Sequence, residues 1–87
     1  MYVIITYDVA VERIDRVRGM LRQYLNWVQN SVFEGELTAG TLEEVSLKLR
    51  DVIDEQKDSV ILNTISNANW LEKKVVGVER AEVSTVL

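Results

Sequence analysis

The chain begins with a continuous run of β-branched and aromatic residues from 2 to 7, which predicts a strand that is central in its sheet or covered on both faces. The run stops at Asp8. From about 11 to 24, apolar residues recur at spacings of three and four, which predicts an amphipathic helix. At about 100° per residue, four arginines border its apolar stripe, two on each side: Arg13 and Arg16, then Arg18 and Arg22.

The middle of the chain predicts a pair of strands and a second helix. Residues 27–34 are rich in strand formers, and Gly35 after them is expected to supply the backbone freedom for a hairpin or a bulge. Thr41, followed by Glu44, is a capping-box signature. The second helix is therefore expected to begin at Thr41 and to end near Glu55.

Two more strands are expected, at 59–65 and 75–78, with a turn or short helical piece at 67–70 between them. The order β-α-β-β-α-β with a short extra C-terminal strand predicts an α+β, ferredoxin-like sandwich with two helices on one face of an antiparallel sheet. No proline, linker or repeat marks a boundary, so 1–87 is expected to be a single domain. Because the other sheet face would be open, we expect a homodimer formed through that face.

Composition restricts the chemistry. The chain has neither cysteine nor histidine, which excludes disulfides, thiolate and imidazole metal sites and Ser-His-Asp catalysis. Any metal must be held by oxygen, so Mg²⁺, or Mn²⁺ in its place, is the expected cofactor. No apolar run approaches the ~20 residues that span a bilayer, and no signal peptide is evident, so no membrane association and a cytoplasmic location are expected.

Charge is unevenly distributed along the chain. The net charge is −4, but the first thirty residues carry four arginines against three acids, while the middle third is strongly acidic. A nucleic acid is therefore expected to meet the N-terminal third. The alternative is that these charges only solvate helix faces.

Asp8 is the most informative single residue, because it follows an apolar strand and precedes a helix. One carboxylate can hold Mg²⁺ if water and substrate phosphate complete the octahedron, and a two-fold dimer would supply a second. Such a metal would activate water for phosphodiester hydrolysis, so Asp8 is the candidate catalytic and metal-binding residue. The alternative is that Asp8 only caps the helix.

Further candidates for contact with nucleic acid surround this position. Arg13 and Arg16 could clamp phosphates, or they could form surface ion pairs with neighbouring acids. Tyr7 and Phe33 could stack on bases, but periodicity also suits them to the core. Ser31, expected in the middle of a strand, could donate to a phosphate, but no histidine or nearby lysine would activate it as a nucleophile.

The strand end Tyr7-Asp8, the arginine-bearing helix and the segment Gln29-x-Ser31-Val32-Phe33-Glu34 together resemble the CRISPR-associated protein two family, over nearly the whole chain. The resemblance implies a ferredoxin-like homodimer with Mg²⁺ near paired aspartates. In position, Asp8 matches the metal ligand, Tyr7 its neighbour and Arg16 a basic residue early in the first helix. Ser31 and Phe33 match the second-strand motif, whereas Trp27 stands where many members have a basic residue.

The resemblance also implies function. It implies a metal-dependent endonuclease acting on single-stranded RNA or double-stranded DNA, with endoribonuclease activity expected, that takes part in CRISPR spacer acquisition and antiviral defence. The alternative it implies is a non-catalytic dimeric adaptor that bridges CRISPR integrase subunits on DNA. A third hypothesis, from the acidity of the chain, is a ligand-sensing module that binds no nucleic acid.

Overall fold

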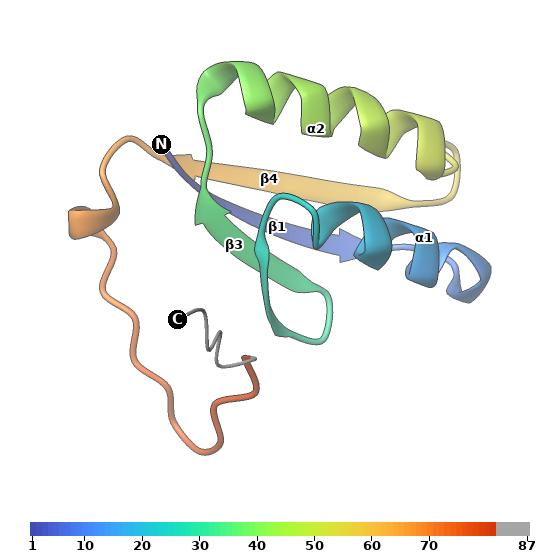
Figure 1. Ribbon diagram of the computed structural model, residues 1–87. Coiled ribbons are helices and arrows are strands. Elements are labelled where there is room, and N and C mark those ends of the chain that lie inside the picture. Colours follow the sequence, from blue (N-terminus) through green and yellow to red (C-terminus); the bar gives the residue numbers. More distant parts are fainter. Residues whose placement is uncertain (82–87) are drawn as a thin grey trace.

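The computed structural model describes residues 1–81, and their secondary structure follows one alternating order. The elements are β1 (Tyr2–Asp8), α1 (Val11–Leu21), β2 (Asn26–Gln29), β3 (Val32–Glu36), α2 (Ala39–Val52), β4 (Ser59–Ile65) and a 3₁₀ turn at Ala68–Trp70 (Figure 1). The 3₁₀ turn confirms the short helical piece expected at 67–70. Within this part of the chain, no helix is long and apolar enough to cross a membrane.

The four strands form one antiparallel sheet in the order β2-β3-β1-β4. β1 is internal, with β3 on one side and β4 on the other. Both helices cover the same face of this sheet (Figure 1). This arrangement confirms the predicted α+β, ferredoxin-like order of elements.

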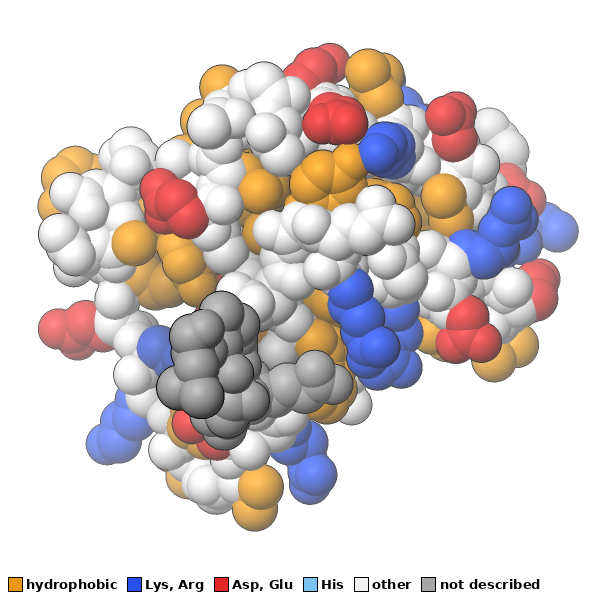
Figure 2. Space-filling view, viewed as in Figure 1, with side chains coloured by type: hydrophobic (Ala, Val, Ile, Leu, Met, Phe, Trp, Pro, Cys, Tyr) orange, Lys and Arg blue, Asp and Glu red, His pale blue; other side chains and the backbone are white. Residues whose placement is uncertain are grey.

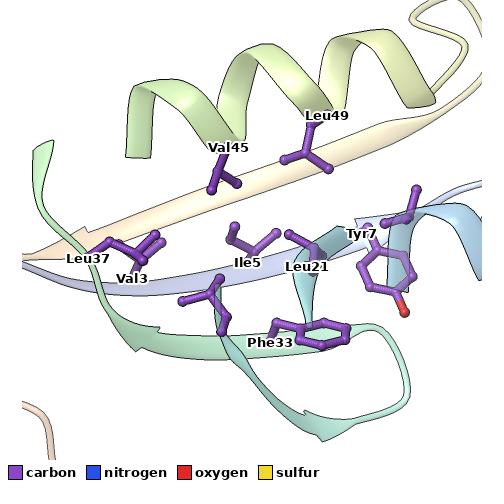
Figure 3. Packing of buried hydrophobic residues seen from close by; sticks show 10 residues of the cluster. Val3, Ile5, Tyr7, Leu21, Phe33, Leu37, Val45 and Leu49 are labelled. Carbon is purple, nitrogen blue, oxygen red and sulfur yellow. The ribbon is translucent and has the colours of Figure 1, made fainter. Parts of the chain in front are cut away.

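The core lies between that face and the two helices (Figure 3). Successive side chains of a strand point to opposite faces, so Val3, Ile5 and Tyr7 of β1 face the helices and are buried. These side chains pack against Val17 of α1 and Val45 of α2, and the other core residues of each helix lie three or four residues away in the sequence. The spacing of apolar residues in the two helices therefore results from their packing against this one face of the sheet.

The β2–β3 hairpin bends at a different place from the one predicted. The turn is formed by Asn30 and Ser31, and Asn30 has a positive φ of 40°, which asparagine tolerates better than most residues. Gly35 instead lies inside β3, opposite Val3. Its missing side chain makes room for Leu25, since a methyl group at Gly35 would lie 3.0 Å from Leu25 Cδ2.

The second helix begins and ends earlier than predicted. Its N-cap is Thr38, whose hydroxyl accepts a hydrogen bond from the N–H of Thr41, so Thr41 lies inside the first turn and is not the cap. The helix ends at Val52, and the N–H of Ile53 closes its last turn on Leu49. The segment that follows turns through residues 54–57 to reach β4.

The predicted strand at 75–78 is wrong for the described chain, in which residues 71–81 form no strand. This segment instead passes the open face of the sheet, where Lys73 forms an ion pair with Glu34 of β3. The same face carries apolar side chains, and Ile61 is 55% exposed there. Homodimer formation through this face remains a prediction.

Candidate metal and nucleic-acid site

Asp8 is an exposed carboxylate at the last position of β1, where its backbone pairs with Ser59 of β4. Its side chain leaves the sheet on the open face, opposite to that of Tyr7. Within residues 1–81 the Asp8 carboxylate has no ion pair and no side-chain hydrogen bond. The N-cap position of α1 is Ala10, without a side-chain cap, so the structure does not support the alternative of Asp8 as a helix cap.

The loop after Asp8 is held by a residue that the sequence analysis missed, Asp58. Its Oδ1 accepts a hydrogen bond from the Ala10 N–H at 2.9 Å, and its Oδ2 accepts one from the Asp54 N–H at 2.9 Å. The Asp58 side chain is only 1% exposed. The Arg13 guanidinium beside it, helped by these backbone N–H groups, holds the pKa of Asp58 well below its usual range, so the carboxylate stays charged. The sequence offers only one signal of this role, which is that Asp58 directly precedes the strand β4 that pairs with β1.

Arg13 is the partner of Asp58. Its Nε and Nη2 donate to the two carboxylate oxygens of Asp58, at 2.6 and 3.0 Å, and its Nη1 contacts Glu12 at 3.3 Å. The predicted ion pair with Glu12 is present, but it is the outer and weaker contact. The two-pronged donor that was assigned to a phosphate is therefore already occupied by a carboxylate.

Arg16 differs from Arg13 in that its side chain is exposed and forms no ion pair within residues 1–81. It lies on the first half of α1, the helix that follows Asp8. Of the two arginines predicted on this border of the helix, only Arg16 is free to meet a phosphate.

Tyr7 and Phe33 belong to the core, which corrects the prediction that they contact nucleic acid directly. They are 3% and 0% exposed, and their ring centroids lie 6.2 Å apart (Figure 3). Adjacent strands carry them on the helix-covered face, so neither ring is open to a base. Burial raises the pKa of the Tyr7 hydroxyl.

Ser31 lies in the β2–β3 turn and not in the middle of a strand, as had been expected. Its carbonyl accepts a hydrogen bond from the Tyr7 N–H at 3.0 Å, which places the turn at the same end of the sheet as Asp8. The side chain is half-buried there. Ser31 therefore keeps the position, although not the strand conformation, that a phosphate contact requires.

A single copy of the described chain supplies few metal ligands. No group of three or more acidic residues within 1–81 is arranged to hold an ion. Asp8 nevertheless fits a hard cation, because it offers exposed carboxylate oxygens that no basic side chain of this part of the chain neutralises. Water and a substrate phosphate, or a second carboxylate, would have to complete the coordination.

Comparison with known proteins agrees with this geometry. A family model for CRISPR associated protein Cas2 matches residues 1–73. A relative in Archaeoglobus fulgidus named CRISPR-associated endoribonuclease Cas2 2 is 50% identical over 80 residues, covering 92% of this chain and 87% of its own. The CRISPR-associated endoribonuclease Cas2 of Methanosarcina acetivorans is 42% identical and aligns over 100% of both chains.

Solved structures give the same result. A crystal structure of Cas2 has a TM-score of 0.85 at 42% identity and covers 100% of this chain and 98% of its own. Streptococcus pyogenes Cas2 has a TM-score of 0.74 at 32% identity, with coverage of 86% and 100%. Sequence and fold thus agree along nearly the whole length, and the chain belongs to the CRISPR-associated protein Cas2 family.

Proposed function

We propose that this chain is a metal-dependent endoribonuclease that works as a homodimer in CRISPR spacer acquisition and antiviral defence. The observation that carries the proposal is the Asp8 carboxylate, which is exposed and unpaired within residues 1–81 at the end of an internal strand. Relatives that align along the whole chain or nearly so are named endoribonucleases, which supports RNA as the substrate. Double-stranded DNA is the second substrate to test.

Asp8 would hold Mg²⁺, or Mn²⁺ in its place. A bound Mg²⁺ polarises a phosphoryl oxygen and lowers the pKa of water. The chain contains no histidine, so it has no side chain that ordinarily exchanges a proton near neutral pH, and this lack favours a metal. Arg16, exposed on the helix that follows, would hold the substrate phosphate, and Ser31 would donate to it from the hairpin turn.

Two copies are proposed because one copy leaves the site incomplete. The open face presents Ile61, with Ile4, Val32 and Ile65 on the same side of the sheet. Packing two such faces together would remove this apolar surface from water. Around a two-fold axis it would also bring a second Asp8 toward the first, giving the two carboxylates that Mg²⁺ accepts.

A CRISPR integrase subunit is the proposed protein partner, and the cytoplasm, where RNA and DNA are both accessible, is the proposed location. Membership of the family and the arginine-rich helix α1 support these proposals. The partner is tested by co-purification of the full chain with a candidate integrase subunit.

The decisive experiment compares the wild type with Asp8→Asn. Labelled single-stranded RNA and double-stranded DNA are incubated with each protein in Mg²⁺, Mn²⁺ or EDTA, while light scattering gives the mass of each protein. We expect metal-dependent cleavage of RNA by a dimer and a loss of at least about 100-fold in Asp8→Asn, the size typical of losing a principal catalytic group. Asp15→Asn, which removes an exposed acid of α1 that forms no ion pair within residues 1–81, is the matched control and should cleave normally.

Cleavage that resists EDTA, a fully active Asp8→Asn protein or a monomeric wild type would each contradict the proposal. A wild type that binds DNA without cutting any substrate, and whose Asp8→Asn variant still assembles with an integrase subunit, would identify the adaptor instead.

A further inference from the structure

Two arginines near the end of α1 lie close together, and neither has an acidic partner among the residues that the structure describes. Arg18 and Arg22 are one helical turn apart, so their side chains leave the same side of α1. The Arg18 guanidinium carbon lies 5.7 Å from the centre of the Trp27 ring in β2. Neither arginine forms an ion pair within residues 1–81, although other basic side chains of this region do: Arg13, Lys48, Arg50 and Lys73.

Figure 2 shows Lys and Arg side chains gathered where α1 ends beside the β2–β3 hairpin. The positions of Arg18, Arg22 and Trp27 in the chain place them at this junction. We call these three residues the α1–hairpin patch. It lies at the end of the sheet where β1 finishes, because the hairpin turn is hydrogen-bonded to Tyr7.

Stability of the fold accounts for only part of this arrangement. A positive charge near the C-terminus of a helix is favourable, and the Trp27 ring attracts the Arg18 guanidinium. Two like charges one turn apart nevertheless repel each other. Arg22 is exposed and has no acid to offset this repulsion in the described chain. An anion from outside would relieve it.

We propose that the α1–hairpin patch binds a strand of nucleic acid, with Arg18 and Arg22 on neighbouring phosphates and the Trp27 ring against a base. This inference rests on the proposed function and adds a contact surface to it. Tyr7 and Asp8 are consecutive in β1 and point to opposite faces. A strand held by the patch therefore has only to pass around the end of β1 to reach Asp8.

Binding is measured with the full chain and a fluorescein-labelled single-stranded RNA in EDTA, so that no cleavage occurs. In Arg18→Gln/Arg22→Gln we expect the Kd to rise at least about 10-fold. The slope of log Kd against log salt should shrink by about 1.4, which is the contribution of two phosphate contacts on a single strand. Arg50→Gln/Lys57→Gln, which removes the same charge from exposed positions elsewhere, should bind like the wild type. Circular dichroism verifies that both variants are folded.

Trp27 also reports on the patch directly. The chain has two tryptophans, so Trp70→Phe leaves Trp27 as the only one. Its emission should change as RNA is added and saturate at the measured Kd. An unchanged emission at saturation, or a double variant that binds RNA as tightly as the wild type, overturns this inference and leaves the proposed function standing. A wild type that binds neither RNA nor DNA overturns both.

Discussion

The Asp58 carboxylate and the Arg13 guanidinium form a two-pronged ion pair that joins the start of β4 to the first turn of α1, with N···O distances of 2.6 and 3.0 Å. Asp58 directly precedes Ser59, the residue whose backbone pairs with Asp8. It also accepts a hydrogen bond from the N–H of Ala10. The buried Asp58 carboxylate thus links the loop that follows Asp8, the proposed metal ligand, to the start of the strand that pairs with Asp8.

Removal of the Asp58 charge should therefore destabilise the fold. Asp58→Asn keeps the size of the side chain but leaves Arg13, which is 18% exposed, without its partner. We expect the Tm to fall by more than about 5 °C in a thermal scan followed by circular dichroism. Amide hydrogen exchange at Ala10 should become faster. Asp51→Asn, at an exposed acid of α2 that forms no ion pair in the described part of the chain, should melt like the wild type.

Acid should weaken the protein through the same group. The folded pKa of Asp58 is depressed from its ordinary value of 3.8, chiefly by the hydrogen bond from Arg13. A depressed pKa gives stability that is fully present above the unfolded pKa and is lost as the pH falls toward the folded one. The Tm difference between wild type and Asp58→Asn should thus be constant from pH 5 to pH 8, a range of about three units, and narrow below about pH 4. A difference that grew on acidification would show that another group controls this pH range.

The strands β1 and β4 were predictable because each is a short run rich in β-branched and other apolar residues. β4 matches its predicted span of 59–65, and the predicted β1 is one residue short, since Asp8 still pairs with Ser59. The ends of α2 were less predictable, because Thr38 and Thr41 both satisfy a capping pattern. The structure uses both, with Thr38 as the cap and its hydroxyl hydrogen-bonded to that of Thr41.

The site was only partly visible in the sequence. Asp8 could be identified because a carboxylate at the end of an apolar strand stays exposed. The partner of Arg13 could not, because Asp58 lies 45 residues away and only the antiparallel pairing of β1 with β4 brings the two together. Phe33 was assigned to nucleic acid because it matches the second-strand motif of the family. Its pairing with Ile5 of β1 instead places the ring on the helix-covered face of the sheet, in the core.

Two glycines should respond in opposite directions to the same substitution. Gly35→Ala places a methyl group 3.0 Å from Leu25 Cδ2 in the packed core and should lower the free energy of unfolding by about 1 to 3 kcal/mol. Gly19 lies on the exposed side of α1 with nothing within 4 Å of an added methyl group. Gly19→Ala should therefore raise the free energy of unfolding by about 0.5 to 1 kcal/mol through helix propensity. Urea denaturation of both variants measures their free energies of unfolding. Equal changes in the two variants would contradict the close contact at Gly35.

Tyr7→Phe should stabilise the protein. The variant removes a buried hydroxyl that has no hydrogen-bond partner within residues 1–81, and such a group costs at least about 1 kcal/mol, so the Tm should rise by about 4 to 8 °C. Tyr24→Phe is the matched control of opposite sign, because the Tyr24 hydroxyl is hydrogen-bonded to Glu44 and Lys48. The Kd of Tyr7→Phe for single-stranded RNA should equal that of the wild type, because the Tyr7 side chain is buried in the core. A Tm that fails to rise would show that the neighbouring Ser31 side chain already satisfies the hydroxyl.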